Sequence, residues 1–254
     1  MIERERLRKF HGQNLPLPIL EQDYVQALFL MELYDRADSL VFKGGTYLKH
    51  AHGLDRFSED LDFTLNGEED VRGKIKEAAD SLSYYGIPAE INRSDETETG
   101  LNLQLVYEGP LYDGTERSKG RIDIEVSKRD DVFLSPEWTR LFFDYPETGA
   151  VTCLGMKLED AMAEKLRALA TRNQARDLYD IWFLLNKDVK PDSNLFERKM
   201  RVVGEDAVVR ITLTEDDWER DLNVFVEHPP DFKDAVNEVI TELEASSFTV
   251  KKAE

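Results

Sequence analysis

Two carboxylates, Asp60 and Asp62, are separated by a single leucine in this sequence. Alternating apolar residues predict a strand at residues 60–65, on which both carboxylates point to the same face. Neighbouring carboxylates repel each other unless a cation lies between them. The pair therefore indicates a site for Mg²⁺, with Mn²⁺ as the alternative ion. An acidic surface edge is the competing interpretation.

A glycine pair precedes these acids in the segment Lys43-Gly44-Gly45-Thr46. We expect a turn here, between a strand at residues 39–42 and a helix that begins at Thr46. Glycine lets the backbone approach a phosphate closely, and the N–H groups of the turn and the Thr46 hydroxyl can donate hydrogen bonds to it. A phosphate anchor followed by a metal site is what nucleotidyl transfer from a triphosphate requires. The glycine pair by itself also fits an ordinary turn, and Lys43 is either a phosphate-binding charge or a solvated neighbour.

A second acidic pair, Asp123 and Glu125, lies within an apolar strand predicted at residues 120–127. These two side chains also share one face of their strand. We expect Asp123 to complete a three-carboxylate metal site, with Glu125 as the alternative. A strand with one solvated polar face is the other interpretation.

A cluster of basic residues occurs in the second half of the chain, on helices predicted at residues 158–172 and 176–185. The cluster contains Lys165, Arg172 and Arg176, and the only acid at residues 163–176 is Glu164. Such a group could hold a triphosphate or an RNA backbone, whereas an ordinary solvated helix is the alternative.

Asp177 and Asp180 follow this basic cluster and are three residues apart, so they share one helix face. For Asp177, capping of the first helical turn is an equally good explanation.

The segments 42–46 and 56–63 together resemble the first signature of the AbiEii/AbiGii toxin group, which includes the MenT toxins and belongs to the polymerase-beta-like nucleotidyltransferases. The segments 163–169 and 176–180 are similar to its second signature. With the acid at Asp123, the resemblance implies catalytic and metal-binding roles. The expected catalytic residues are Asp60, Asp62, Asp123, Lys165 and Asp177, of which Asp60, Asp62 and Asp123 bind the metal; the expected nucleotide-binding residues are Gly44, Gly45, Thr46, Ser58, Lys165 and Arg176.

The fold expected from these patterns is α+β, with a mixed-sheet nucleotidyltransferase core of the polymerase-beta-like type and a helical C-terminal subdomain. We place the core with its N-terminal helices at residues 1–149 and the mainly helical subdomain at residues 150–254. Residues 186–194 suit a linker, and residues 202–213 have strand-like or ambiguous character. The further elements expected are helices at 22–34, 68–85 and 231–243 and strands at 88–92 and 101–107.

The composition limits the partners. A net charge of −19 argues against both DNA coating and sequence-specific DNA binding, but a local basic patch could still bind RNA. The acidity also suits solubility or a high-salt cytoplasm. No apolar run is long enough for a membrane span and residues 1–6 lack an apolar signal core, so we expect a cytoplasmic protein without a membrane partner. We expect the single cysteine, Cys153, to be a buried apolar residue.

These features predict a Mg²⁺-dependent, toxin-like nucleotidyltransferase that moves NMP from an NTP to an acceptor hydroxyl and releases pyrophosphate. A tRNA 3′ end or another RNA is the expected acceptor, and the family resemblance suggests a cognate antitoxin. Two alternatives remain open: an NTP-binding regulatory or toxin-partner module without turnover, and an enzyme that transfers a nucleotidyl or phosphate group to a protein.

Overall fold

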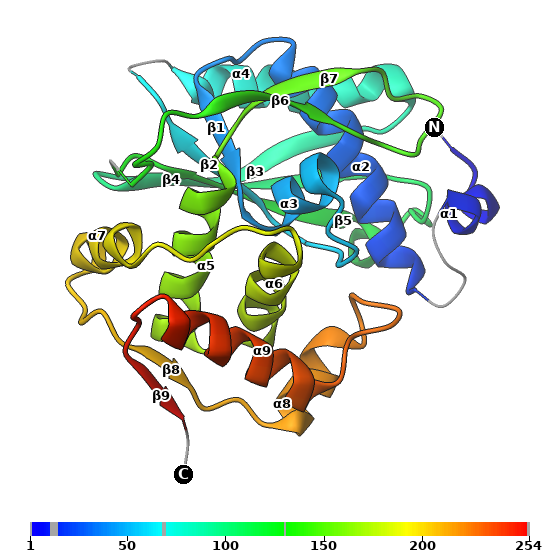
Figure 1. Ribbon diagram of the computed structural model, residues 1–254. Coiled ribbons are helices and arrows are strands. Elements are labelled where there is room, and N and C mark those ends of the chain that lie inside the picture. Colours follow the sequence, from blue (N-terminus) through cyan, green and yellow to red (C-terminus); the bar gives the residue numbers. More distant parts are fainter. Residues whose placement is uncertain (1, 11–14, 68–69, 130, 253–254) are drawn as a thin grey trace. The chain divides into compact units, whose positions relative to one another are not determined.

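A computed structural model describes residues 2–10, 15–67, 70–129 and 131–252. The chain divides into two compact units (Figure 1). The first, here called the sheet unit, consists of Met1–Asp130 and Pro136–Gly155. The second, the C-terminal unit, consists of Asp131–Ser135 and Met156–Glu254.

The sheet unit is built on seven strands in the order β3-β4-β5-β2-β1-β7-β6. Two neighbouring pairs, β1 with β7 and β2 with β5, are parallel, and the other pairs are antiparallel. This mixed sheet confirms the predicted fold class. The strands are β1 Leu40–Lys43, β2 Leu61–Leu65, β3 Ala89–Thr97, β4 Gly100–Tyr107, β5 Gly120–Ser127, β6 Glu137–Leu141 and β7 Val151–Gly155.

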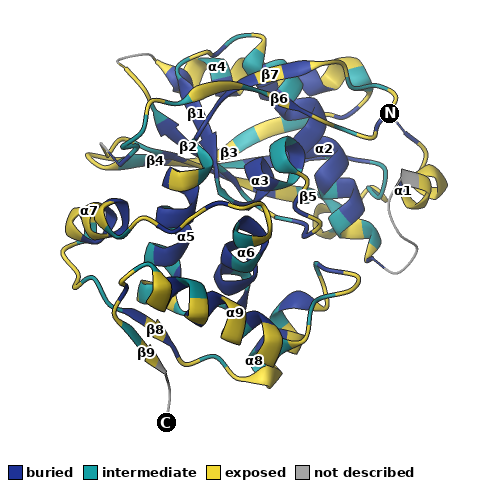
Figure 2. Cartoon of the chain, in the orientation of Figure 1, coloured by how far each residue is buried: buried dark blue, intermediate teal, exposed yellow. Residues whose placement is uncertain are grey.

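Helices α2 and α3 cover one face of this sheet. The ring of Phe42 on β1 lies with its centroid 6.3 Å from that of Tyr34 on α2 and 5.6 Å from that of Tyr47 on α3. Phe63 on β2 stacks against Phe42 at 5.0 Å, so the apolar side of β2 faces these helices, as the alternation predicted. Much of α2 is accordingly dark blue in Figure 2. The helices are α1 Arg4–Phe10, α2 Leu17–Tyr34, α3 Gly44–His52, α4 Val71–Ser81 and the short 3₁₀ helix η1 Leu82–Tyr85.

The C-terminal unit is mainly helical, with α5 Leu158–Arg172, α6 Ala175–Asn186, α7 Ser193–Val203, α8 Glu215–Leu222 and α9 Phe232–Ala245. A parallel pair of short strands, β8 Val209–Ile211 and β9 Val250–Lys252, completes it. The strand-like interpretation of residues 202–213 was wrong outside residues 209–211. Helix α7 was missed because Asp192 was assigned to a linker. In the structure the Asp192 side chain caps this helix by accepting hydrogen bonds from two backbone N–H groups.

A buried ion pair ties the segment Asp131–Ser135 to the C-terminal unit. Lys199 on α7 lies 2.7 Å from the Asp160 carboxylate, whose other oxygen accepts backbone hydrogen bonds from Phe133 and Leu134 at 2.6 and 2.9 Å. Lys199 also donates to the carbonyl of Asp131. This segment therefore belongs to the C-terminal unit, although the strands that flank it in sequence belong to the sheet unit.

The sheet continues beyond residue 149, because β7 pairs with β1 through the register Val41↔Leu154. The division of the chain into separately folding domains stays a prediction. Among the helices that the structure describes, none is both long and apolar enough to cross a membrane.

Candidate active site

The two halves of the first signature meet in the sheet unit. Strand β1 ends at Lys43 and α3 begins directly at Gly44, without the separate turn expected from the sequence. Gly44 has a φ of +76°, and a Cβ placed there would lie 2.1 Å from Oδ2 of Asp62. The Asp62 carboxylate therefore rests against the Gly44 Cα, at a position that only glycine fits without strain.

The second glycine contacts the segment that precedes the acids. A Cβ on Gly45 would lie 2.5 Å from the Arg56 guanidinium and 2.8 Å from the Ser58 hydroxyl. Thr46 is fully buried, and its hydroxyl donates a 2.6 Å hydrogen bond to the Asp60 carbonyl. The structure thus uses the Thr46 hydroxyl to fix the start of β2, whereas the sequence suggested a phosphate ligand.

Two glutamines on α2, which the sequence did not single out, hold the same segment. Gln26 donates from Nε2 to the carbonyls of Ser58 at 3.1 Å and Glu59 at 2.8 Å. Gln22, one helical turn earlier, donates to Glu59 at 2.8 Å and to the carbonyl of Arg121 at 3.2 Å. A buried glutamine within the apolar run of α2 was the available signal, because a buried amide needs hydrogen-bond partners.

Asp62, Asp123 and Glu125 lie on one face of the sheet, and Asp60 immediately precedes β2. In the parallel pairing of β2 with β5, Asp62 is in register with Glu125, and the neighbouring pair is Leu61↔Ile124. Asp123 lies two residues before Glu125 on β5, is exposed, and accepts a 2.9 Å hydrogen bond from Gln104. The residue that flanks Asp62 is therefore Glu125, the alternative to Asp123.

Among the described residues, no group of three or more Asp, Glu, His or Cys side chains is arranged to hold a metal ion. The metal site of Asp60, Asp62 and Asp123 stays a prediction. Two carboxylates nevertheless fit Mg²⁺, because this ion is usually held by one or two carboxylates together with phosphate oxygens of the substrate. Asp60 and Asp62 are both partly accessible and two residues apart, which suits that arrangement.

The second signature forms an ion-pair cluster between α5 and α6 within the C-terminal unit. Lys165 lies 2.6 Å from the Asp180 carboxylate and 3.8 Å from Asp177. Arg172 donates from Nε and Nη2 to the two oxygens of Asp177 at 2.7 and 2.8 Å. Both aspartates are fully buried, while the Arg172 side chain is about half exposed. The aspartates thus hold two cations in fixed positions.

Gln174, and not Asp177, is the N-cap of α6, so the capping explanation for Asp177 was wrong. The Arg176 guanidinium is 5.4 Å from the Phe225 ring centroid. Cys153 is fully buried, as predicted, and burial raises the pKa of its thiol to about 12.

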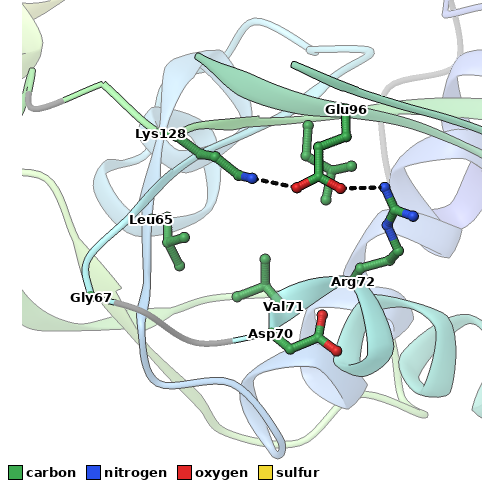
Figure 3. Close-up of a pocket in the computed structure, with 8 residues that line it drawn as sticks. Leu65, Gly67, Asp70, Val71, Arg72, Glu96 and Lys128 are labelled. Carbon is green, nitrogen blue, oxygen red and sulfur yellow. Dashed lines mark hydrogen bonds and ion pairs between the residues drawn. The ribbon is translucent and has the colours of Figure 1, made fainter. Parts of the chain in front are cut away.

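A cavity of about 620 Å³ lies elsewhere in the sheet unit (Figure 3). Its two cations, Arg72 and Lys128, bind the same carboxylate of Glu96 at 2.7 and 2.5 Å. The hydrogen bond and charge of Lys128, followed by the charge of Arg72, lower the pKa of Glu96. Glu96 and Asp70 together balance the charges of Arg72 and Lys128, so the cavity lining has no net positive charge to attract a phosphate. None of its described lining residues is a predicted site residue.

A protein family matches most of this chain. The family model of the nucleotidyl transferase AbiEii toxin, of type IV toxin–antitoxin systems, matches residues 26–243. A search of curated proteins gives no match.

Solved structures share the fold. MenT4, a nucleotidyltransferase toxin from Mycobacterium tuberculosis H37Rv, aligns with a TM-score of 0.74 and 20% identity over 97% of this chain and 90% of its own. JHP933 from Helicobacter pylori aligns with a TM-score of 0.59 and 21% identity over 91% of this chain and 93% of its own.

Proposed function

The chain belongs to the AbiEii nucleotidyl transferase toxin family of type IV toxin–antitoxin systems and is a nucleotidyltransferase, and from this premise we propose that it transfers NMP from an NTP to an acceptor hydroxyl of RNA in a Mg²⁺-dependent reaction. A tRNA 3′ end is the proposed acceptor. The observation that supports this proposal most directly is the contact of Gly44 with Asp62, which places the N-terminus of α3 beside a carboxylate of the acidic pair.

Each part of this region has a proposed role. The N–H groups at the start of α3, at Gly44 and Gly45, donate to the triphosphate, because the first N–H groups of a helix have no partner within the helix. Ser58, beside Gly45, is a further nucleotide-binding residue. Asp60 and Asp62 would hold Mg²⁺, which supplies positive charge against the negative charge that develops on the phosphoryl oxygens.

The reaction forms a bond between the acceptor oxygen and the α-phosphorus, while the bond from that phosphorus to the bridging oxygen breaks and pyrophosphate leaves. The hydroxyl proton passes to water. In this scheme the protein contributes orientation and electrostatic stabilisation, which are the main sources of catalysis in phosphoryl-group transfer.

Lys165, Arg176 and Asp177 are proposed to serve the same reaction because they form the second family signature. The ion pairs support a refined assignment for Asp177. Its carboxylate is fully buried and bound to Arg172, so it acts as a positioning residue for the cations. Lys165 would contact the triphosphate while Asp180 fixes its ammonium group.

The experiment is a transfer assay with each of the four α-labelled NTPs, Mg²⁺ and either purified tRNA or total RNA. We expect label in RNA together with released pyrophosphate, and loss of both in Asp62→Asn. Glu98→Gln is the matched control, because Glu98 is an exposed acid in the turn between β3 and β4. Absence of labelled RNA with every NTP would contradict the RNA acceptor, and label in added protein would favour the protein-modifying alternative.

The toxin activity and the proposed cognate antitoxin can be examined in cells. Expression of the chain is expected to arrest growth, whereas Asp62→Asn at the same protein level should not. Co-expression of a neighbouring gene product that restores growth would identify the antitoxin.

A further inference from the structure

Strand β6, at one edge of the sheet, and the residue that follows it carry two exposed aromatic side chains. Trp138 and Phe142 are 62% and 64% exposed, although both side chains are large and apolar. Arg140 lies between them in sequence, and its guanidinium is 5.5 Å from the Phe142 ring centroid. Leu141, which points to the other side of the strand, is 1% exposed. We call Trp138, Arg140 and Phe142 the β6 row.

Strand registers place the β6 row on the same face of the sheet as the carboxylates. Trp138 pairs with Leu154 of β7, and Leu154 pairs with Val41 of β1. Lys43, two residues after Val41 on the same strand face, pairs with Asp62 of β2. Because residues in register share a face, Trp138 and Asp62 lie on the face opposite the one that α2 and α3 cover.

The β6 row also leads toward the carboxylates. Strand β6 is antiparallel to β7, which is parallel to β1, so the Trp138 end of the row lies at the end of the sheet where β1 reaches Gly44. Three strand spacings and one two-residue step separate Trp138 from Asp62, or roughly 15 Å between their Cα atoms. A short single-stranded chain can span this distance.

The charge of this surface favours RNA. The residues of β6 and β7 on this face are Trp138, Arg140, Thr152 and Leu154, which include one cation and no carboxylate, in a protein of net charge −19. Aromatic rings stack with unpaired bases, and arginine binds phosphates and also stacks. Stacking does not depend on base identity, whereas a protein partner would need a complementary surface.

We propose that the β6 row is a stacking platform that binds the unpaired end of the RNA acceptor and directs its terminal hydroxyl toward Asp60 and Asp62. This proposal rests on the proposed function, because it assigns a binding surface to the RNA of that reaction.

The test is fluorescence anisotropy with a 5′-labelled, pyrimidine-rich RNA of roughly 12 nucleotides, a length within the range of single-strand sites. Trp138→Ala and Phe142→Ala should each weaken binding roughly 5- to 150-fold, the equivalent of one lost base stack. Arg140→Gln should reduce the slope of log affinity against log salt by about 0.7, as expected for one lost phosphate contact. Trp138→Phe, which keeps a stacking ring, should restore most of the affinity.

Tyr84→Ala is the matched control, because Tyr84 on η1 is 85% exposed and lies outside the β6 row. Both aromatic side chains of the β6 row are mostly exposed, so their removal should leave the unfolding transition nearly unchanged. In the transfer assay, Trp138→Ala should raise the KM for RNA and leave kcat near that of the wild type.

The outcomes separate this proposal from the proposed function. Wild-type RNA affinity in both alanine variants, with RNA still labelled, overturns the platform and leaves the function intact. Loss of a co-purified protein partner without loss of RNA affinity also overturns it, in favour of a protein-docking surface. If the wild-type enzyme labels no RNA with any NTP, the proposed acceptor fails, and the platform fails with it.

Discussion

Gly44 offers a sharp perturbation of the candidate site, because an added methyl group would meet the Asp62 carboxylate. In Gly44→Ala, the new Cβ would lie 2.1 Å from Oδ2, 2.9 Å from Cγ and 3.0 Å from Cβ of Asp62. Rotation of the short Asp62 side chain cannot relieve the contact with its own Cβ, so β2 or the start of α3 must shift. The φ of +76° adds a backbone cost of about 1–2 kcal/mol for a residue with a side chain.

Gly53 provides the control for the backbone term alone. It ends the same helix with a φ of +79°, and a Cβ there would meet nothing within 4 Å. Gly53→Ala should therefore lose about the same 1–2 kcal/mol of unfolding free energy without moving Asp62. The difference between the two variants isolates the displacement of the carboxylate.

The assay combines urea unfolding with labelled-NTP turnover. We expect both variants to be destabilised, and Gly44→Ala alone to lose roughly 100-fold in kcat, the usual effect of a 1 Å misplacement at a reacting centre. Equal turnover in folded Gly44→Ala and Gly53→Ala would refute the reasoning, since the position of Asp62 would then not matter for catalysis.

Four further outcomes can be measured. Gln26→Leu should remove the two hydrogen bonds to the carbonyls before the acidic pair, lowering the unfolding free energy by about 1–3 kcal/mol and reducing kcat; wild-type turnover would contradict a positioning role. Lys199→Met should cost about 3–5 kcal/mol in a urea unfolding experiment, because it leaves a buried carboxylate without its cation, and a loss below 1 kcal/mol would disagree. Glu125→Gln should raise the Mg²⁺ concentration for half-maximal activity more than Asp123→Asn does, because Glu125 is in register with Asp62; the reverse order would favour Asp123 as the third ligand. Cys153 should resist thiol reagents at pH 8 until the protein is unfolded, because a pKa of about 12 keeps the thiol protonated; fast labelling of the folded protein would contradict its burial.

Local periodicity was sufficient for much of the fold. Helix α5 begins and ends where the sequence pattern predicted, as does strand β5, because each carries a regular repeat that buries one side. Strands β6 and β7 were not predicted. Only the last residue of β6 is buried, and four of the five residues of β7 are buried, so neither strand presents the alternation that a pattern can detect.

The sequence by itself determined which chemical groups are present and their order, and it predicted the strand that carries Asp62. These properties depend on residue type and on spacing within one element, which the backbone period fixes. The family follows from the same local signatures.

Only the tertiary structure decided which groups meet. It set Gly44 against Asp62, placed Glu125 beside that carboxylate, and bound Lys165 to Asp180. Contacts between elements depend on strand register and helix packing, which result from burial summed over the whole chain and leave no mark in any short stretch of sequence.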